Sequence, residues 1–302
     1  MQTGKITKFV GLTAAAALAL SACSDSGESG GDGGGDGGEG GGTVTLGILP
    51  SWTDGLSMAH LWKVILEEEG YTVEIEEMSE AGPLYTAVAE GDYDVYPSAW
   101  PQVTHADYME EYGDDLEDLG AYYEGAVLTM AVPEYTEVDS IAELNDNAEL
   151  FDGQITGIEP GAGLTGVIDD SAIPEYNLGD NYEHVTSSTT AMLTELEEAT
   201  ENEEDILVAL WRPFWANAEY PVKDLEDPKG AMGEPETLNA IANAEFSSEF
   251  PDVAEWMGNL TLDDEQYGEL EDLVVNQHED DPAAGAEEFV ENNQDLIDSV
   301  TE

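Results

Sequence analysis

The stretch TVTLGILPSWTDGLSMAHLWKVILEEEGYTVEIEEMSEAGPLYTAVAEGDYDVYPSAW, residues 43–100, contains an alternating series of strand and helix patterns. Residues 43–49 alternate and then run apolar, as a buried strand does, and 71–75 and 94–96 carry further strand patterns. Between them, 54–69 and 84–89 place apolar side chains at helical spacing, and a glycine follows each segment closely. The order strand, helix, strand, helix, strand predicts an α/β lobe with a mainly parallel sheet.

A second series of the same kind follows the first. Strands are expected at 126–132, 154–158, 182–186 and 206–210, and helices at 164–172 and 189–199. After residue 227 only helices are expected, at 253–257, 263–275 and 283–297. The chain therefore predicts two α/β lobes, with residues 43–132 and 230–302 in lobe 1 and residues 133–229 in lobe 2.

Three of the six tryptophans follow predicted strands and lie close to a proline: Trp52, Trp100 and Trp211. We expect each of them in a loop at a strand's end, the edge where open α/β folds bind small ligands. Indole is also the best side chain for holding a quaternary ammonium group, which offers no hydrogen-bond donor and is bound by π faces. The alternative is that each is a core tryptophan. We interpret Trp62, Trp215 and Trp256 as packing residues.

The N-terminus has the pattern of a secretion signal. Residues 1–22 combine two lysines, a short apolar run and small residues before Cys23, the only cysteine. The segment 20–23, LSAC, is typical of a bacterial lipobox, which predicts that Cys23 is lipidated and anchors the protein to the outer face of the membrane. The alternative is an ordinary cleaved signal. Residues 23–42, which are rich in Gly and Asp, are expected to form a flexible tether.

The charge is strongly acidic. The chain has 69 acidic and six basic residues among 302, a formal net charge of −63. Nucleic acid and anionic lipid surfaces would be repelled, which excludes both as partners. The apolar residues are nevertheless regularly patterned, which argues against disorder. At about 1 M salt the Debye length falls to about 3 Å, so carboxylate repulsion is screened. The composition therefore predicts a protein of a halophile.

Several segments, taken in order, resemble the glycine betaine substrate-binding proteins of ABC importers: 52–54 (WTD), 66–73 (LEEEGYTV), 82–91 (GPLYTAVAEG), 98–100 (SAW), His105, Tyr108, 125–126 (GA), 132–133 (VP), 157–163 (GIEPGAG) and 211–215 (WRPFW). The resemblance runs from about residue 43 to the C-terminus. It implies a two-lobed periplasmic-binding-protein fold, type II-like, with the ligand cleft between the lobes.

The resemblance also implies the roles of particular residues. Trp52, Trp100 and Trp211 match the three tryptophans that box the trimethylammonium group, and His105 matches a histidine that helps to hold the carboxylate. Backbone amides of the Gly-rich turn complete the carboxylate site and map to Gly163 and Leu164. The turn itself, between a predicted strand and helix, exposes amides suited to an anion.

Two residues depart from the family's pattern. Arg212 stands where a small or polar residue is usual, and Phe214 stands where histidine is frequent. Three interpretations of Arg212 are open: it contacts the ligand carboxylate, it contacts the other lobe on closure, or it pairs with surface carboxylates.

The leading hypothesis is a monomeric extracytoplasmic receptor that binds glycine betaine or a related zwitterion and delivers it to an ABC importer permease, with no cofactor or metal. Choline, carnitine, proline betaine and ectoine are alternative ligands. A structural surface lipoprotein and a secreted hydrolase are the alternatives from other classes. Residues 43–302 contain no Gly-x-Ser-x-Gly elbow, no His-Glu-x-x-His motif and no cysteine, which disfavours the hydrolase.

Overall fold

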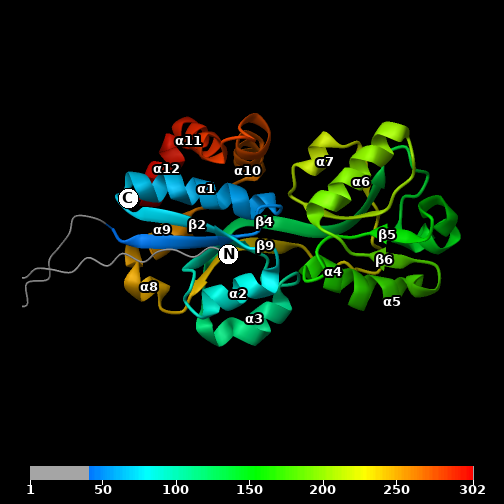
Figure 1. The fold of residues 1–302 in the computed structure, drawn as a ribbon, viewed down its shortest axis with the longest axis horizontal. Helices are drawn as coiled ribbons and strands as arrows, with labels where there is room; N and C mark the ends of the chain where they lie inside the picture. The colour runs from blue at the N-terminus through cyan, green and yellow to red at the C-terminus, as the bar shows by residue number, and fades with distance from the viewer. Residues whose placement is uncertain (1–40, 302) are drawn as a thin grey trace, which may run out of the picture. The chain divides into compact units, whose positions relative to one another are not determined.

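A computed structural model describes residues 41–301 of the chain. The predicted signal peptide, Cys23 and almost all of the predicted tether lie outside the described residues. Two sheets organise the described part, and the long strand β4 (Leu116–Pro133) takes part in both (Figure 1).

The first lobe is built on a mixed sheet. Parallel pairs join β1 to β2 and β1 to β3, whereas β9 pairs antiparallel with both β3 and β4. The remaining strands of this sheet are β1 (Thr43–Ile48), β2 (Thr72–Glu77), β3 (Val95–Ala99) and β9 (Glu236–Asn243).

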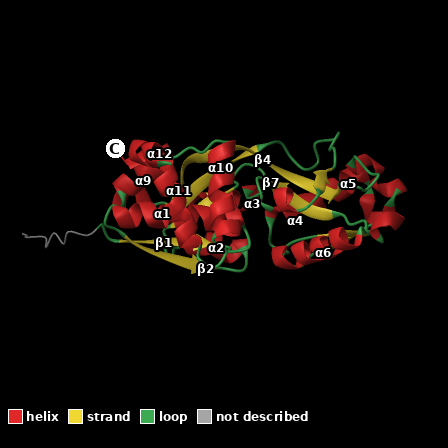
Figure 2. Ribbon diagram, turned by 90° about the horizontal axis from the view of Figure 1, so that it is seen from above, coloured by secondary structure: helices red, strands yellow, loops and turns green. Residues whose placement is uncertain are grey.

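Helices cover both faces of this sheet (Figures 1 and 2). They are α1 (Thr53–Glu68), α2 (Ala81–Ala89), α3 (Ala106–Tyr112), α8 (Phe246–Glu249), α9 (Pro251–Asn259), α10 (Asp264–Glu271), α11 (Pro282–Asn292) and α12 (Gln294–Thr301), with a 3₁₀ turn at Gly113–Asp115 and a π-helical turn at Asp272–Gln277.

The second lobe has a smaller sheet. Parallel pairs join β5 to β6 and β5 to β7, and β7 and β8 both pair antiparallel with the C-terminal half of β4. Its elements are β5 (Gln154–Thr156), β6 (Glu183–Val185), β7 (Val208–Arg212), β8 (Val222–Asp224), α4 (Gly163–Val167), α5 (Ile173–Tyr176), α6 (Thr189–Asn202) and α7 (Ala216–Glu219), with 3₁₀ turns at Ile141–Asp146, Ala148–Phe151 and Leu178–Asp180 and a π-helical turn at Ile168–Ala172.

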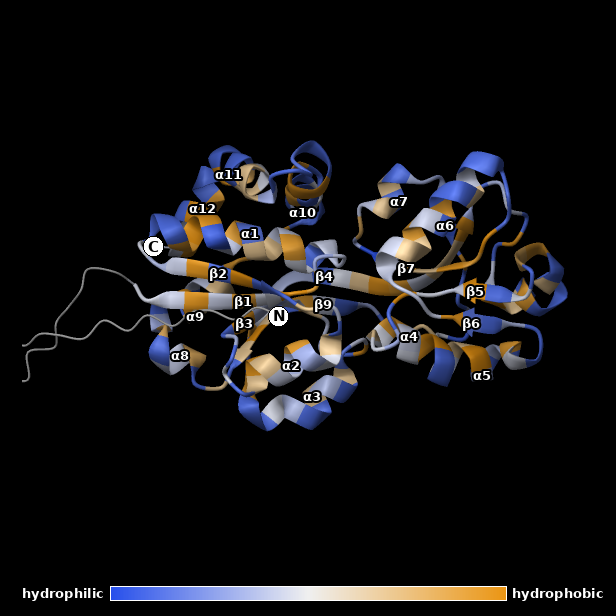
Figure 3. Ribbon diagram, viewed as in Figure 1, coloured by the Kyte–Doolittle hydropathy of each residue, from blue (hydrophilic) through white to orange (hydrophobic). Residues whose placement is uncertain are grey.

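The hydropathy pattern explains this layering. Apolar residues lie on the strands and on the inward faces of the helices, whereas the outward faces are hydrophilic (Figure 3). In α1, for example, Met58, Leu61, Trp62 and Ile65 are buried, and the helix ends before Gly70, whose φ of 90° suits glycine. The predicted packing role of Trp62 agrees with its 1% exposure. No helix among residues 41–301 is both long and apolar enough to span a membrane.

Two expectations about the sheet were wrong. Residues 236–243 form the strand β9, although only helices were expected beyond residue 227. The sheet is also mixed rather than mainly parallel, because β4 and β9 both run antiparallel to their neighbours. The lobe limits at Val132 and Lys229 stay a prediction; β4 exchanges its partner β9 for β7 between Ala126 and Val127.

Candidate functional site

The three predicted tryptophans line one pocket. Trp52 directly precedes α1 and Trp100 directly follows β3, so both come from loops of the first lobe. Trp211 lies within β7, where it pairs with Leu128 of β4, so its predicted position in a loop was wrong. The three side chains are 8%, 5% and 6% exposed. Segments that lie far apart in the sequence thus bring three indoles into one enclosed space.

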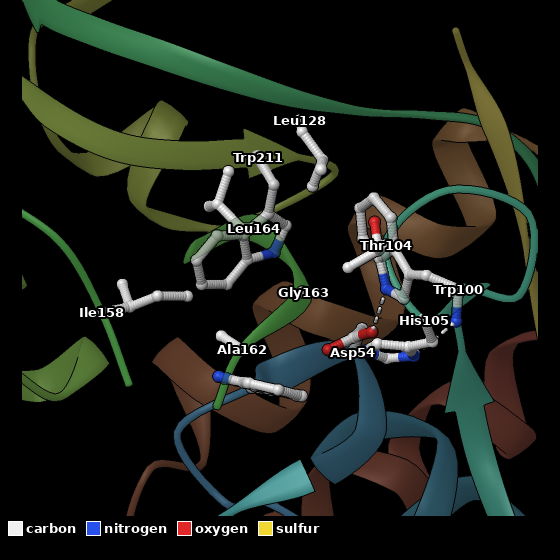
Figure 4. Close-up of a pocket in the computed structure, with 11 residues that line it drawn as sticks. Asp54, Trp100, Thr104, His105, Leu128, Ile158, Ala162, Gly163, Leu164 and Trp211 are labelled. Carbon is white, nitrogen blue, oxygen red and sulfur yellow. Dashed lines mark hydrogen bonds between the residues drawn. The ribbon is translucent and has the colours of Figure 1, made fainter. Parts of the chain in front are cut away.

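Both lobes contribute to the pocket, which is lined by Trp52, Asp54, Trp100, Thr104, His105, Leu128, Ile158, Ala162, Gly163, Leu164 and Trp211. Trp211 and Leu164 lie on one side of it, and Trp100, His105 and Asp54 lie on the other (Figure 4). All six residues predicted to bind the ligand are therefore among the lining residues.

Asp54 is a lining residue that sequence reasoning missed. It lies in the first turn of α1, and its carboxylate accepts a hydrogen bond from Trp100 Nε1 at 3.0 Å (Figure 4). Ser98 Oγ donates a second hydrogen bond to this carboxylate at 2.5 Å. Burial raises the pKa of Asp54, and these two hydrogen bonds oppose that rise. The carboxylate both fixes the Trp100 indole and places an acidic group beside the pocket.

His105 lies at the N-terminus of α3 with its ring buried. Its Nδ1 accepts the backbone N–H of Trp100 at 3.1 Å and lies 3.0 Å from Tyr85 Oη. Because a backbone N–H can only donate, Nδ1 is unprotonated, and the proton of the neutral ring is on Nε2. Burial lowers the pKa of His105 to about 3. The ring therefore offers a neutral N–H donor at physiological pH.

Gly163 and Leu164 begin α4, where the first backbone N–H groups have no partner within the helix. The first lobe approaches closely at this point, because a Cβ added to Gly163 would lie 1.7 Å from the carbonyl oxygen of Thr104. Only glycine permits that approach. The loop carrying Thr104 is itself fixed by Glu236, which accepts hydrogen bonds from the amides of Val103 and Thr104.

Arg212 does not line this pocket. Its guanidinium pairs with Asp224 of β8, and the Arg212 side chain is 41% exposed. Phe214, the other departure from the family's pattern, stacks on Trp211 with ring centroids 4.1 Å apart. It therefore backs the indole rather than offering a polar group to the pocket.

The basic residues of the described chain lie elsewhere. Lys63 pairs with Glu67, Lys223 pairs with Asp139, and the ammonium of Lys229 lies over the ring of Tyr176. Among residues 41–301, none of these cations lines the pocket. An anionic group there can be bound only by neutral donors such as the His105 ring and backbone amides.

This combination of an apolar aromatic wall, a buried carboxylate and a set of neutral donors can hold a small molecule with a cationic end and an anionic end. A two-lobed α/β fold that encloses such a pocket between its lobes defines the chain as a solute-binding protein. Residues 42–292 match the model of the family described as the substrate-binding domain of ABC-type glycine betaine transport systems, and the chain belongs to that family.

Individual relatives agree with this assignment. The glycine betaine/carnitine transport binding protein GbuC of Listeria monocytogenes is 32% identical over 158 residues, which cover 52% of this chain and 52% of that protein. The chain thus matches about half the length of this curated relative.

Two solved structures are similar over most of the chain. The glycine betaine, L-proline-binding protein ProX of Borrelia burgdorferi has a TM-score of 0.78 at 29% identity, covering 84% of this chain and 95% of that one. Lactococcal OpuAC, in a closed conformation complexed with glycine betaine, has a TM-score of 0.78 at 28% identity, and the match covers 86% of this chain and 99% of that one.

Proposed function

We propose that this protein is the extracytoplasmic receptor of an ABC importer and that it binds glycine betaine, or a closely related quaternary-ammonium zwitterion, without turning it over. The observation that supports this most is that Trp52, Trp100 and Trp211 come from both lobes and line one pocket together with His105. A pocket shared by two lobes suits a receptor that closes around its ligand. The relatives that bind glycine betaine support the choice of ligand.

The cationic end of the ligand is assigned to the indoles. Each indole in contact with a desolvated quaternary ammonium group contributes about 2 kcal/mol. The buried carboxyl group of Asp54 lies beside them and, in its ionised form, favours a cation over a neutral group of the same size.

The anionic end is assigned to His105 Nε2 and to the amides of Gly163 and Leu164. Hydrogen bonds from neutral donors to a charged acceptor contribute about 1.5–3 kcal/mol each when they are buried. Together with the indoles, these contacts are sufficient for micromolar binding, about −8 kcal/mol, after the cost of association.

A cation without a carboxylate, such as choline, is the second candidate. The observation that favours it is Asp54, because a buried carboxylate with no basic neighbour in the pocket can balance a single positive charge. Choline has one hydroxyl oxygen in place of the carboxylate and would leave most of the donors of His105, Gly163 and Leu164 without an acceptor, which is why the zwitterion is preferred.

The test is a fluorescence titration of the purified protein with glycine betaine, choline and ectoine in about 2 M salt. The buried indoles should give a saturable change with glycine betaine at micromolar concentration. A response to choline or ectoine but none to glycine betaine would change the ligand and keep the receptor. Folded protein that responds to none of the three contradicts the proposal.

Three further properties belong to the same proposal: a lipid anchor on Cys23, a monomeric state and a need for salt. The LSAC segment and the sole cysteine support the anchor, and the net charge of −63 supports the salt requirement. Mass spectrometry of the membrane-extracted protein should find a diacylglyceryl group on Cys23. If Cys23 is unmodified and the protein is recovered free of membrane, the lipid anchor is rejected, and the other parts of the proposal are unaffected.

A further inference from the structure

Glu159 is a buried carboxylate that lies just outside the pocket and joins the two lobes. It follows β5 in the turn 157–163, and its side chain is 7% exposed. Within the second lobe it accepts the backbone N–H of Thr189 at 2.9 Å and Thr189 Oγ1 at 2.8 Å. It also accepts hydrogen bonds from two residues of the first lobe, from Trp52 Nε1 at 3.3 Å and from Ser51 Oγ at 3.4 Å.

The two sets of bonds differ in what they depend on. Thr189 and Glu159 belong to the same lobe, and Thr165 Oγ1 also donates to the Glu159 carbonyl at 2.8 Å, so the position of Glu159 does not depend on the other lobe. The bonds from Ser51 and Trp52 exist only while the lobes are together. The Glu159 carboxylate, which is held in place by its own lobe, therefore accepts two hydrogen bonds from the other lobe when the lobes close.

Trp52 is one of the lining indoles, and its ring stacks over His105 with centroids 6.0 Å apart. Trp100 has a comparable bond to a carboxylate, but its acceptor Asp54 belongs to the same lobe. The orientation of Trp100 is thus fixed within one lobe, whereas the N–H of Trp52 finds its acceptor only across the cleft. Once the lobes close and exclude water, an indole N–H without an acceptor costs free energy, and Glu159 supplies that acceptor, so the bond supports the closed arrangement.

We propose that Glu159 is a positioning residue that couples lobe closure to completion of the ligand cage. It accepts the indole N–H of Trp52 in the closed form, which fixes one wall of the cage and holds the lobes together. The proposal rests on the proposed function, because a cage needs a ligand to enclose. Glu159 is not a lining residue, so it acts through Trp52 and not by touching the ligand.

Stopped-flow fluorescence with glycine betaine tests the proposal by separating the association and dissociation rates. Glu159→Ala should raise the dissociation rate at least tenfold and change the association rate less than threefold, because the bond forms after the ligand has entered. Glu159→Gln, which keeps one acceptor oxygen, should restore part of the slow dissociation. The matched control is Asp205→Asn, since Asp205 accepts Thr136 Oγ1 within the second lobe.

A distance measurement between the lobes supplies a readout that needs no binding kinetics. Spin labels are placed on Glu90→Cys and Glu198→Cys, two exposed positions on different lobes, with Cys23→Ser to remove the native thiol. Adding Glu159→Ala should shift the distance distribution towards longer separations, and adding Asp205→Asn should not. A cooperative thermal unfolding transition of each variant shows that the variant is folded.

The outcomes separate the two proposals. Wild-type protein that does not bind glycine betaine contradicts the proposed function, and the role of Glu159 in lobe closure is then judged on the lobe distances alone. Wild-type protein that binds, together with a Glu159→Ala variant whose dissociation rate and lobe distances match wild type, overturns the role of Glu159. A slower association at unchanged dissociation rate also overturns it.

Discussion

Substitution of His105 by alanine should weaken the binding of glycine betaine far more than the binding of choline. The structure gives the reason: two donors face Nδ1, so the neutral ring directs its only N–H through Nε2, and the ring lines the pocket. Glycine betaine has a carboxylate to accept that N–H, and choline has none. The two ligands share the trimethylammonium group, so any general damage to the cage affects both.

The size of the effect follows from one buried hydrogen bond to a charged acceptor, which contributes about 1.5–3 kcal/mol. The glycine betaine Kd should therefore rise about 10- to 150-fold relative to any change in the choline Kd. The pKa of about 3 means that His105 stays neutral between pH 5 and 8, so this ratio should not change across that range.

Isothermal titration calorimetry of wild type and His105→Ala with both ligands, at pH 5, 6.5 and 8, measures the ratio directly. Nitrogen-15 spectra of the imidazole should show the Nε2–H tautomer throughout this range. Equal losses for the two ligands would refute the assignment of the carboxylate to His105. A ratio that titrates near pH 6.5 would refute the neutral donor.

Three further predictions concern the lobe contact, the cage and the acidic core. Gly163→Ala should weaken glycine betaine binding at least tenfold in a titration, because the added Cβ would clash with the Thr104 carbonyl oxygen. The control Gly166→Ala has no atom within 4 Å of the added Cβ and should bind glycine betaine like wild type. Equal affinities of the two variants would show that the close contact at Gly163 is not needed. Trp211→Leu removes one π face and should raise the Kd about 30-fold by calorimetry, and an unchanged Kd would remove this indole from the cage. Burial raises the pKa of Glu271 from 4.5 to about 8, so the folded state holds a proton that the unfolded chain has released, and stability falls as the pH rises between those values. In urea melts at pH 5 to 8, Glu271→Gln should therefore lose stability less steeply than wild type, by up to about 1.4 kcal/mol per pH unit, and parallel slopes would place the Glu271 pKa below this range.

Much of the fold could be predicted because its pattern is local. The helix α1 shows its apolar face at helical spacing and a glycine just past its end, and β1 alternates before it runs apolar. β9 was not predicted because its sequence, ETLNAIAN, has few β-branched residues and no regular alternation of apolar and polar residues. It forms a strand because it pairs with β3 on one side and β4 on the other. Tertiary pairing of this kind leaves no local signal.

The candidate site divides in the same way. Tryptophan is rare, so Trp52, Trp100 and Trp211 stand out from the sequence. Asp54 and Glu159 do not, because the chain has 69 acidic residues and residue type alone cannot select two of them. Burial together with contact to a tryptophan distinguishes these carboxylates, which are 3% and 7% exposed and accept indole N–H groups. In so acidic a chain, the folded contacts carry the information that composition does not.

The central claim is that the aromatic pocket recognises a positive charge and not merely an apolar shape. Calorimetry with glycine betaine and with 3,3-dimethylbutanoate tests it directly, because the second compound replaces the ammonium nitrogen by carbon and keeps the carboxylate. Three indoles and the Asp54 carboxylate should bind glycine betaine at least 100-fold more tightly than its uncharged-head analogue. Equal affinity for the two compounds would contradict the account.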